Sequence, residues 1–113
     1  MDKLTRYRDL IKRYLSDLAA LVNRDPKAGV ETSCVFDEDR GHYLLINTGW
    51  ARGRRIRGAT LYVRLKNGKV WIEEDWTEEG IGNFLVEAGV PKEDIVLAFQ
   101  APEMRALTDF AVA

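Results

Sequence analysis

The 113-residue sequence contains one cysteine, Cys34, and one histidine, His42, and this scarcity excludes several kinds of site. A single cysteine cannot form an intramolecular disulfide, which fits a reducing compartment. One Cys and one His cannot supply the four nitrogen or sulfur ligands of a structural zinc site. They could still form a Cys–His pair for nucleophilic catalysis. A lone cysteine between Ser33 and Val35 is, however, more typical of a small buried hydrophobe.

Long apolar runs are also absent. None approaches the ~20 residues that a membrane-spanning helix needs. The opening segment, MDKLTRYRDLIKRYL, has interleaved charges and lacks the apolar stretch of a secretory signal. We therefore expect a cytoplasmic protein with no membrane contact, and the length predicts a single domain over residues 1–113.

An excess of positive charge is missing as well. The chain has 17 Lys and Arg against 18 Asp and Glu, a net charge of −1. It therefore lacks the overall basic character of a stand-alone DNA-binding domain. The charge is uneven, since residues 1–57 hold 12 basic and 8 acidic side chains and residues 58–113 hold 5 and 10. Any contact with DNA would have to be indirect or use a local patch.

Apolar residues at helical spacing from Leu4 to Val22 predict a long amphipathic helix with Asp2 as its N-cap. Proline cannot continue a helix, so the helix should end between Asn23 and Pro26. The simplest expectation is a helix that packs on a sheet. The alternating spacing of three and four residues would also allow a coiled-coil seam with a partner chain.

The middle of the sequence predicts four antiparallel strands. The segments with strand character are 30–36, 42–50, 56–65 and 69–74. Asn67-Gly68 between the last two is a strong signal for a two-residue hairpin, because both residues tolerate a positive φ. The register that this turn sets pairs Arg64 with Trp71 and Tyr62 with Glu73.

After the hairpin, a short helix should begin at Thr77 as N-cap, with Glu78 and Glu79 in its first turn. Gly89 and Pro91 are typical of its end. A further strand over 95–99 and a docked C-terminal tail should follow. The predicted fold is α+β: a long N-terminal helix packed on an antiparallel β-meander, then a short helix, a further strand and a docked C-terminal tail.

The predicted hairpin has one face for the core and one that could bind a partner. The first face carries Leu61, Val63, Leu65, Val70 and Ile72. The second carries the candidate partner-binding residues Tyr62, Arg64, Trp71 and Glu73. Arg64 over the Trp71 ring would form a cation–π contact. This amphipathic face is either covered by the protein's own second layer or offered to another subunit.

Four arginines around a glycine form the one concentrated basic feature, namely Arg52, Arg54, Arg55 and Arg57. Guanidinium groups suit both phosphates and carboxylates, so these residues are candidates for contact with phosphate or with an acidic partner. The alternative is a solvated hairpin tip, since the loop has no interleaved aromatic platform for base stacking.

An acidic cluster near the second helix raises the question of metal catalysis. It comprises Glu73, Glu74, Asp75, Glu78 and Glu79. A two-metal nuclease needs converging carboxylates, often with a nearby lysine in a Glu-x-Lys triplet, and this sequence has no such triplet. Turn and helix-cap chemistry accounts for most of these acids. We predict no metal and no other cofactor.

Several long segments together resemble the XisI family, the fdxN element excision controlling factors. The most specific are HYLLINTGW, RRIRGATLYVRLKNGKVWI, TEEGIGNFLVEAGVPKEDIVLAFQAP and the terminal TDFAVA, and the resemblance covers essentially the whole chain. Two positions depart from the family pattern. Trp76 stands where the family tends to have glycine, and Tyr62 stands where many relatives carry histidine.

The resemblance implies an accessory role in site-specific DNA rearrangement, together with a recombinase and a companion controlling factor that looks nuclease-like. It brings no established catalytic residues. The leading hypothesis is therefore a non-enzymatic factor that acts by protein contacts, with DNA contacted indirectly or through the Arg52–Arg57 loop and with a homodimer left open. One alternative is an antidote-type subunit that restrains the nuclease-like companion. Another is a small nuclease or hydrolase that uses Glu73, Asp75 or His42.

Overall fold

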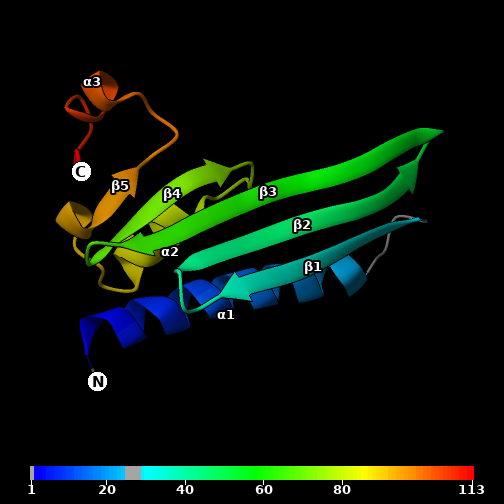
Figure 1. The fold of residues 1–113 in the computed structure, drawn as a ribbon, viewed down its shortest axis with the longest axis horizontal. Helices are drawn as coiled ribbons and strands as arrows, with labels where there is room; N and C mark the ends of the chain where they lie inside the picture. Colours follow the sequence, from blue (N-terminus) through cyan, green and yellow to red (C-terminus); the bar gives the residue numbers. More distant parts are fainter. Residues whose placement is uncertain (1, 25–28) are drawn as a thin grey trace.

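The computed structural model describes residues 2–24 and 29–113 and has the predicted α+β fold (Figure 1). Its elements are α1 (Lys3–Arg24), β1 (Val30–Asp37), β2 (His42–Ala51), β3 (Arg54–Lys66), β4 (Lys69–Asp75), α2 (Ile81–Glu87), the 3₁₀ turn η1 (Lys92–Asp94), β5 (Ile95–Leu97) and α3 (Pro102–Arg105). Within these described ranges, no helix is both long enough and apolar enough to cross a bilayer.

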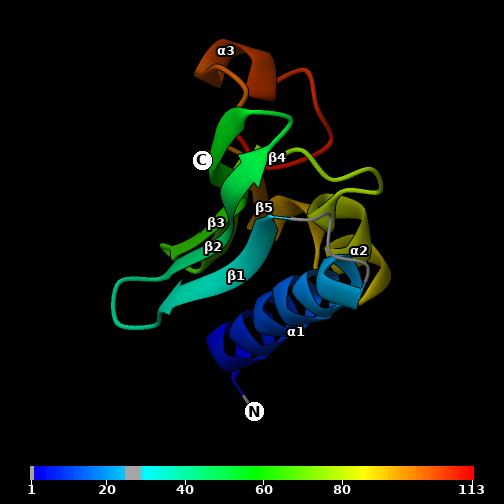
Figure 2. The same ribbon diagram turned by 90° about the vertical axis from the view of Figure 1, so that its right-hand side faces the viewer.

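The five strands form one sheet in the order β1-β2-β3-β4-β5. The first four make the predicted antiparallel meander, and β5 is parallel to β4 because α2 carries the chain back between them. Figure 2 shows α1 and α2 on the same side of the sheet. We call this side of the sheet its inner face and the opposite side its outer face.

Helix α1 packs on the inner face of the sheet, which confirms the prediction of a helix packed on a sheet. Its buried residues Tyr7, Ile11, Leu15 and Ala19 recur every four residues and so form one stripe. The predicted N-cap is confirmed, because the Thr5 N–H donates to the Asp2 carboxylate at 2.8 Å. The helix ends at Arg24, within the predicted range of Asn23 to Pro26.

Alternate residues of the central strands complete the core. Those fully buried on the inner face are Tyr43, Leu45, Leu61, Val63, Val70 and Ile72. Of the five hairpin residues predicted to face the core, Leu65 alone is partly exposed, and it still packs against the buried cluster. The period of two that separates buried from outward side chains is the period of a β-strand.

The N-terminal end of α1 is fastened to the turn before β5. Asp94, whose side chain is 13% exposed, accepts a hydrogen bond from the Tyr7 hydroxyl and forms an ion pair with Lys3 at 3.0 Å. Burial raises the pKa of Tyr7 to about 12, and the Asp94 carboxylate adds to this shift. Burial opposes the ionisation of Asp94, but the hydrogen bonds from Tyr7 and Lys3 prevail and lower its pKa.

The β3–β4 hairpin follows the predicted register only next to its turn. Asn67 and Gly68 both have positive φ, and Leu65, Arg64 and Val63 pair with Val70, Trp71 and Ile72 as predicted. A β-bulge then shifts the register, so that Tyr62 lies opposite Glu74 and not opposite Glu73. The prediction of a Tyr62–Glu73 pair is therefore wrong, because a bulge places two residues of one strand against one of its neighbour.

The start of α2 differs from its prediction. The helix begins at Ile81, four residues after the predicted cap Thr77, with Gly80 as its N-cap residue at φ 82°. Asp75 organises this turn, since its carboxylate accepts hydrogen bonds from the N–H groups of Thr77 and Ile81, both at 2.8 Å. A positive φ also explains Gly80. Nothing in the structure requires Gly82, where an added Cβ would make only ordinary contact with Ile72.

The C-terminal tail docks as predicted. The Ala111 N–H donates to the Ile95 carbonyl at 2.8 Å, and Ala111 forms a parallel bridge with Val96. The Arg105 guanidinium donates to the Ala98 and Gln100 carbonyls. These contacts keep the short helix α3 next to the β4–β5 end of the sheet (Figures 1 and 2).

Candidate functional site

In the described part of the chain, no helix lies over the outer face of the sheet beside β1, β2 and β3 (Figure 2). Cross-strand pairing places Val35 of β1, Leu44 of β2 and Tyr62 of β3 in one row on this face. Val35 is 44% exposed, while Leu44 and Tyr62 are partly buried. Of this row, Tyr62 belongs to the predicted partner-binding residues, whereas Val35 and Leu44 are added by the structure.

The next row of the outer face contains two more of the candidates. His42, Arg64 and Trp71 lie opposite one another on β2, β3 and β4. The His42 Nδ1 atom is 2.7 Å from the hydroxyl of Tyr62, and this hydrogen bond joins the two rows. The Arg64 Nε atom is buried and has no hydrogen-bond partner within the described ranges. The structure therefore gathers Tyr62, Arg64 and Trp71 on one face.

Trp71 is covered by cations other than the predicted one. The Lys66 ammonium lies 4.9 Å from its ring centroid and the Arg105 guanidinium 5.7 Å from it. The indole N–H donates to the Lys66 carbonyl at 3.0 Å. The prediction of an Arg64–Trp71 cation–π contact is wrong, because a residue of the docked tail occupies that place. The β4 end of the outer face is consequently covered by the chain itself.

Glu73 does not pair with the other candidates. It is the extra residue of the bulge and has no cross-strand partner in the β3–β4 register. Its neighbour Glu74 takes the position opposite Tyr62 and accepts a hydrogen bond from the Trp76 indole at 2.6 Å. The bulge therefore separates Glu73 from the row that contains Tyr62.

The four arginines lie at the far end of the β2–β3 hairpin, which we call the arginine arm (residues 50–57). Arg52 and Gly53 form its two-residue turn, with φ 52° and φ 74°. Arg54, Arg55 and Arg57 belong to β3, so most of the predicted loop is strand. All four arginine side chains are exposed, as a contact site for phosphate or carboxylate requires.

Sequence reasoning missed one residue of this arm. Trp50 is 59% exposed and lies opposite Arg55, whose guanidinium is 5.7 Å from the indole centroid. An aromatic ring therefore does accompany the arginines. The available signal was the two-residue turn, since a hairpin closed at Arg52-Gly53 pairs position 50 with position 55.

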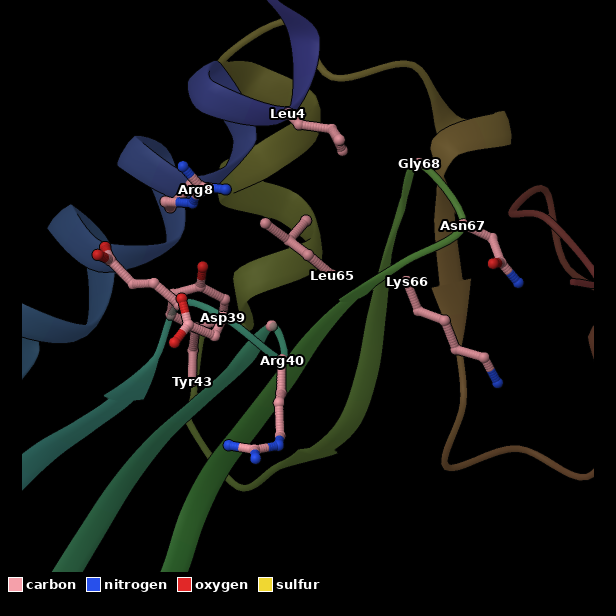
Figure 3. A pocket seen from close by; sticks show the side chains of 11 residues that line it. Leu4, Arg8, Asp39, Arg40, Tyr43, Leu65, Lys66, Asn67 and Gly68 are labelled. Atoms are coloured by element: carbon pink, nitrogen blue, oxygen red, sulfur yellow. The ribbon is translucent and has the colours of Figure 1, made fainter.

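A cleft of about 190 Å³ lies between α1 and the turns that follow β1 and β3 (Figure 3). Tyr43 is fully buried there, and its hydroxyl has no hydrogen-bond partner within residues 2–24 and 29–113. The neighbouring Tyr43 hydroxyl raises the pKa of Arg8, although the two groups are not aligned as a hydrogen bond. Lys66 and Asn67 point away from Arg8 (Figure 3). Arg8 is thus the basic residue next to the tyrosine hydroxyl, while Arg40 and Lys66 line other parts of the cleft.

The residues considered for catalysis are dispersed. Cys34 pairs with Leu45 on the inner face, whereas His42 is on the outer face, so the proposed Cys–His pair does not form. Burial raises the pKa of the Cys34 thiol, which disfavours a thiolate. Asp75 is engaged at the start of α2. The described ranges contain no group of three or more His, Cys, Asp or Glu side chains placed to hold a metal ion.

Comparison with known proteins agrees with the fold. The sequence profile of the family described as XisI protein matches residues 1–112. The crystal structure of a XisI-like protein from Anabaena variabilis ATCC 29413 has a TM-score of 0.89 and 37% sequence identity, covering 97% of this chain and 99% of that one.

A second crystal structure from the same organism is that of the fdxN element excision controlling factor XisI. It has a TM-score of 0.83 and 37% identity, covering 99% of this chain and 100% of that one. None of the curated proteins matches the sequence. Since the profile and both structures span nearly the whole length, the chain belongs to the XisI family.

Proposed function

We propose that this chain is an accessory factor that controls site-specific excision of a DNA element, and that it acts by contacts with other proteins and not by catalysis of its own. A solved relative that is 37% identical over the full length is named an excision controlling factor. The partner that the family resemblance suggests is a nuclease-like companion controlling factor, which would connect this chain to a recombinase.

The outer face of the sheet is the observation that carries this proposal. A sheet must cover its apolar faces, and here α1 and α2 lie on the inner face (Figure 2), while Arg105 of α3 reaches the outer face at Trp71 of β4. The row of Val35, Leu44 and Tyr62 remains accessible between the β1 edge and the tail-covered Trp71. An exposed group of apolar side chains that includes a tyrosine, here Tyr62 at the β3 end of the row, is typical of protein interfaces.

The test is co-purification of the tagged full-length chain with the product of the neighbouring open reading frame. Val35→Glu places a charge at the β1 end of the apolar row and should abolish capture. Val22→Glu is the matched control, because Val22 lies on α1 and is 45% exposed, against 44% for Val35. Equal capture by the two variants would contradict the use of this face.

Two alternatives make different predictions in the same experiment. An antidote-type subunit would use the same contact, but adding it would suppress nuclease activity of the companion. A small metal-dependent nuclease would cleave DNA with Mg²⁺ alone, and its activity would be lost in Glu73→Ala. Cleavage of this kind by the purified chain would overturn the proposal.

A further inference from the structure

Among the described residues, the edge of β3 is unpaired along its first residues, next to the β2–β3 turn. Only Leu61–Lys66 of β3 pair with β4, and the Thr60 carbonyl accepts a hydrogen bond from the Trp76 N–H at 2.9 Å. Along Arg54–Ala59, no strand in the described ranges lies on the side away from β2. We call this segment the free edge. An added Cβ at Gly58 would meet nothing within 4 Å, so the face of β3 to which this position points is also open.

The register shows which backbone groups of the free edge are available. A two-residue hairpin closes with a hydrogen-bonded pair, here Ala51 and Arg54, and bonded and non-bonded pairs then alternate. Trp50, opposite Arg55, donates its N–H to Gly29 at 2.9 Å and therefore away from β3. The N–H and C=O groups of Arg55, Arg57 and Ala59 accordingly point outward from the sheet.

The edge strand β1, in contrast, has outward backbone groups that are already hydrogen-bonded at Thr32. The Asn23 side chain at the end of α1 donates to the Thr32 carbonyl at 2.9 Å and accepts from the Thr32 N–H at 3.3 Å. An amide side chain thus occupies the edge where another strand would pair. Native sheets protect their edges in such ways to prevent strand addition. At the free edge of β3 the flanking feature is a set of arginines.

Resting on the proposed function by protein contacts, we propose that the free edge of β3 binds an extended acidic segment of a partner protein, which adds as a strand beside Arg54–Ala59. Strand addition of this kind gains main-chain hydrogen bonds from the edge and specificity from alternate side chains. Arg55 and Arg57 are two residues apart and so lie on one face, where acidic side chains at alternate positions of the added strand would meet them.

The charge at this edge disfavours a second copy as the occupant. Two free edges paired about a twofold axis would bring the arginines of one copy opposite those of the other, and like charges in directly opposed positions are destabilising. Nucleic acid would also match the arginines and Trp50, but it cannot use the outward N–H and C=O groups as a strand does. An acidic strand would bind both the arginine side chains and the outward N–H and C=O groups of the backbone.

The first test uses the unaltered full-length protein and a synthetic seven-residue peptide of alternating Val and Glu. The peptide should bind, and its affinity should fall as salt is added. Two further peptides carry N-methyl groups on the Val residues only or on the Glu residues only. A strand pairs through alternate residues, so one of these peptides should lose binding and the other retain it. Equal binding by both would overturn strand addition.

The second test separates charge from backbone at one position. Arg57→Ala removes only the guanidinium, whereas Arg57→Pro also removes an N–H that β2 does not use. Peptide binding should be about tenfold weaker in the Pro variant than in the Ala variant. Equal affinities of the two variants would show that only side chains contribute and would overturn the proposal.

Two other occupants would each give a recognisable contrary result. Binding of duplex or single-stranded DNA in place of the peptide would assign the edge to nucleic acid. A dimer of the protein alone that Arg57→Pro dissociates would assign it to a second copy. Because Val35→Glu leaves the free edge intact, loss of companion capture in that variant with retained peptide binding distinguishes the outer face from the edge.

Discussion

The β1 edge and the free edge of β3 differ in whether their outward N–H and C=O groups are hydrogen-bonded. At β1 the Asn23 side chain bonds both the N–H and the C=O of Thr32, a residue that is 4% exposed. At β3 the segment Arg54–Ala59 runs past the end of β4 and keeps its outward groups unpaired within the described residues. One edge is closed by the chain itself, and the other is accompanied by four exposed arginines.

This difference is the basis of the proposal that a partner adds a strand at β3. One side chain is enough to protect an edge residue, since the Asn23 amide alone bonds both backbone groups of Thr32 in β1. The β3 edge has no equivalent, although its neighbours include the Trp50 indole and the Arg55 guanidinium. The contrast supports the proposal that a partner strand adds at the β3 edge and not at the β1 edge, and it can be tested by variants at each edge.

The largest expected effect comes from proline in the paired backbone of the arm. The N–H of Ile56 faces Gly49 in β2, so Ile56→Pro removes a ladder hydrogen bond and disturbs a partly buried side chain. It should lower the free energy of unfolding by roughly 2–4 kcal/mol. Arg57→Pro, one residue further along, should cost less than about 1 kcal/mol. Urea unfolding of both variants measures this, and equal losses would contradict the assigned backbone directions.

The next largest effect concerns the hydrogen bond between Tyr7 and Asp94, which holds α1, and with it Asn23, in place. Tyr7→Phe removes the hydrogen bond to the Asp94 carboxylate and should cost about 1.5–3 kcal/mol at neutral pH. The pKa of Tyr7 is raised from 10.0 to about 12, so this stabilisation is complete below pH 10 and is lost as the pH rises towards 12.

The measurement is urea unfolding of the wild type and Tyr7→Phe at pH 8 and at pH 11. The difference in free energy between the two proteins should shrink at the higher pH. A difference that stays constant would mean that the hydroxyl proton does not stabilise the fold.

Opening the β1 edge should have a smaller effect. Asn23→Ala leaves the N–H and C=O of Thr32 without their partner and should lower the free energy of unfolding by about 1–2 kcal/mol. Asn23→Asp is the graded control, because a carboxylate can accept from the N–H but cannot donate to the carbonyl. In thermal unfolding, the melting temperature should be highest for the wild type, lower for Asn23→Asp and lowest for Asn23→Ala. Analytical ultracentrifugation should show more self-association in Asn23→Ala than in the wild type.

The smallest effect on stability is expected at the arginine arm. Replacing Arg52, Arg54, Arg55 and Arg57 together by Gln should change the free energy of unfolding by no more than about 0.5 kcal/mol, because these side chains are exposed. The same variant should lose binding of the acidic peptide. A large loss of stability would mean that the arginines serve folding and not contact.

Much of the fold could be predicted from local sequence. The Asn67-Gly68 turn sets the correct register as far as Val63, and the apolar stripe of α1 identifies the residues that reach the core. The bulge after Val63 could not be predicted, because no glycine or proline marks it. The start of α2 was misplaced because Thr77 matched a capping pattern, while the actual acceptor, Asp75, lies six residues before Ile81.

The sequence identified several residues of the candidate sites, but it could not predict which of them the rest of the chain covers. Tyr62, Arg64 and Trp71 do share one face, but the docking of Arg105 on Trp71 depends on a contact between distant segments. Asn23 and Thr32 form another such contact, between a helix end and a strand edge. The free edge itself follows from a difference in strand length, which requires the ends of β3 and β4 to be known.

Amide hydrogen exchange of the full-length chain, with and without the Val–Glu peptide, tests the central claim most directly. In the free protein the amides of Arg55, Arg57 and Ala59 should exchange fast, and those of Ile56 and Gly58 slowly. Addition of the peptide should slow exchange at Arg55, Arg57 and Ala59 and leave Thr32 in β1 unchanged. Unaltered exchange at these three amides, or new protection along β1, would contradict the account.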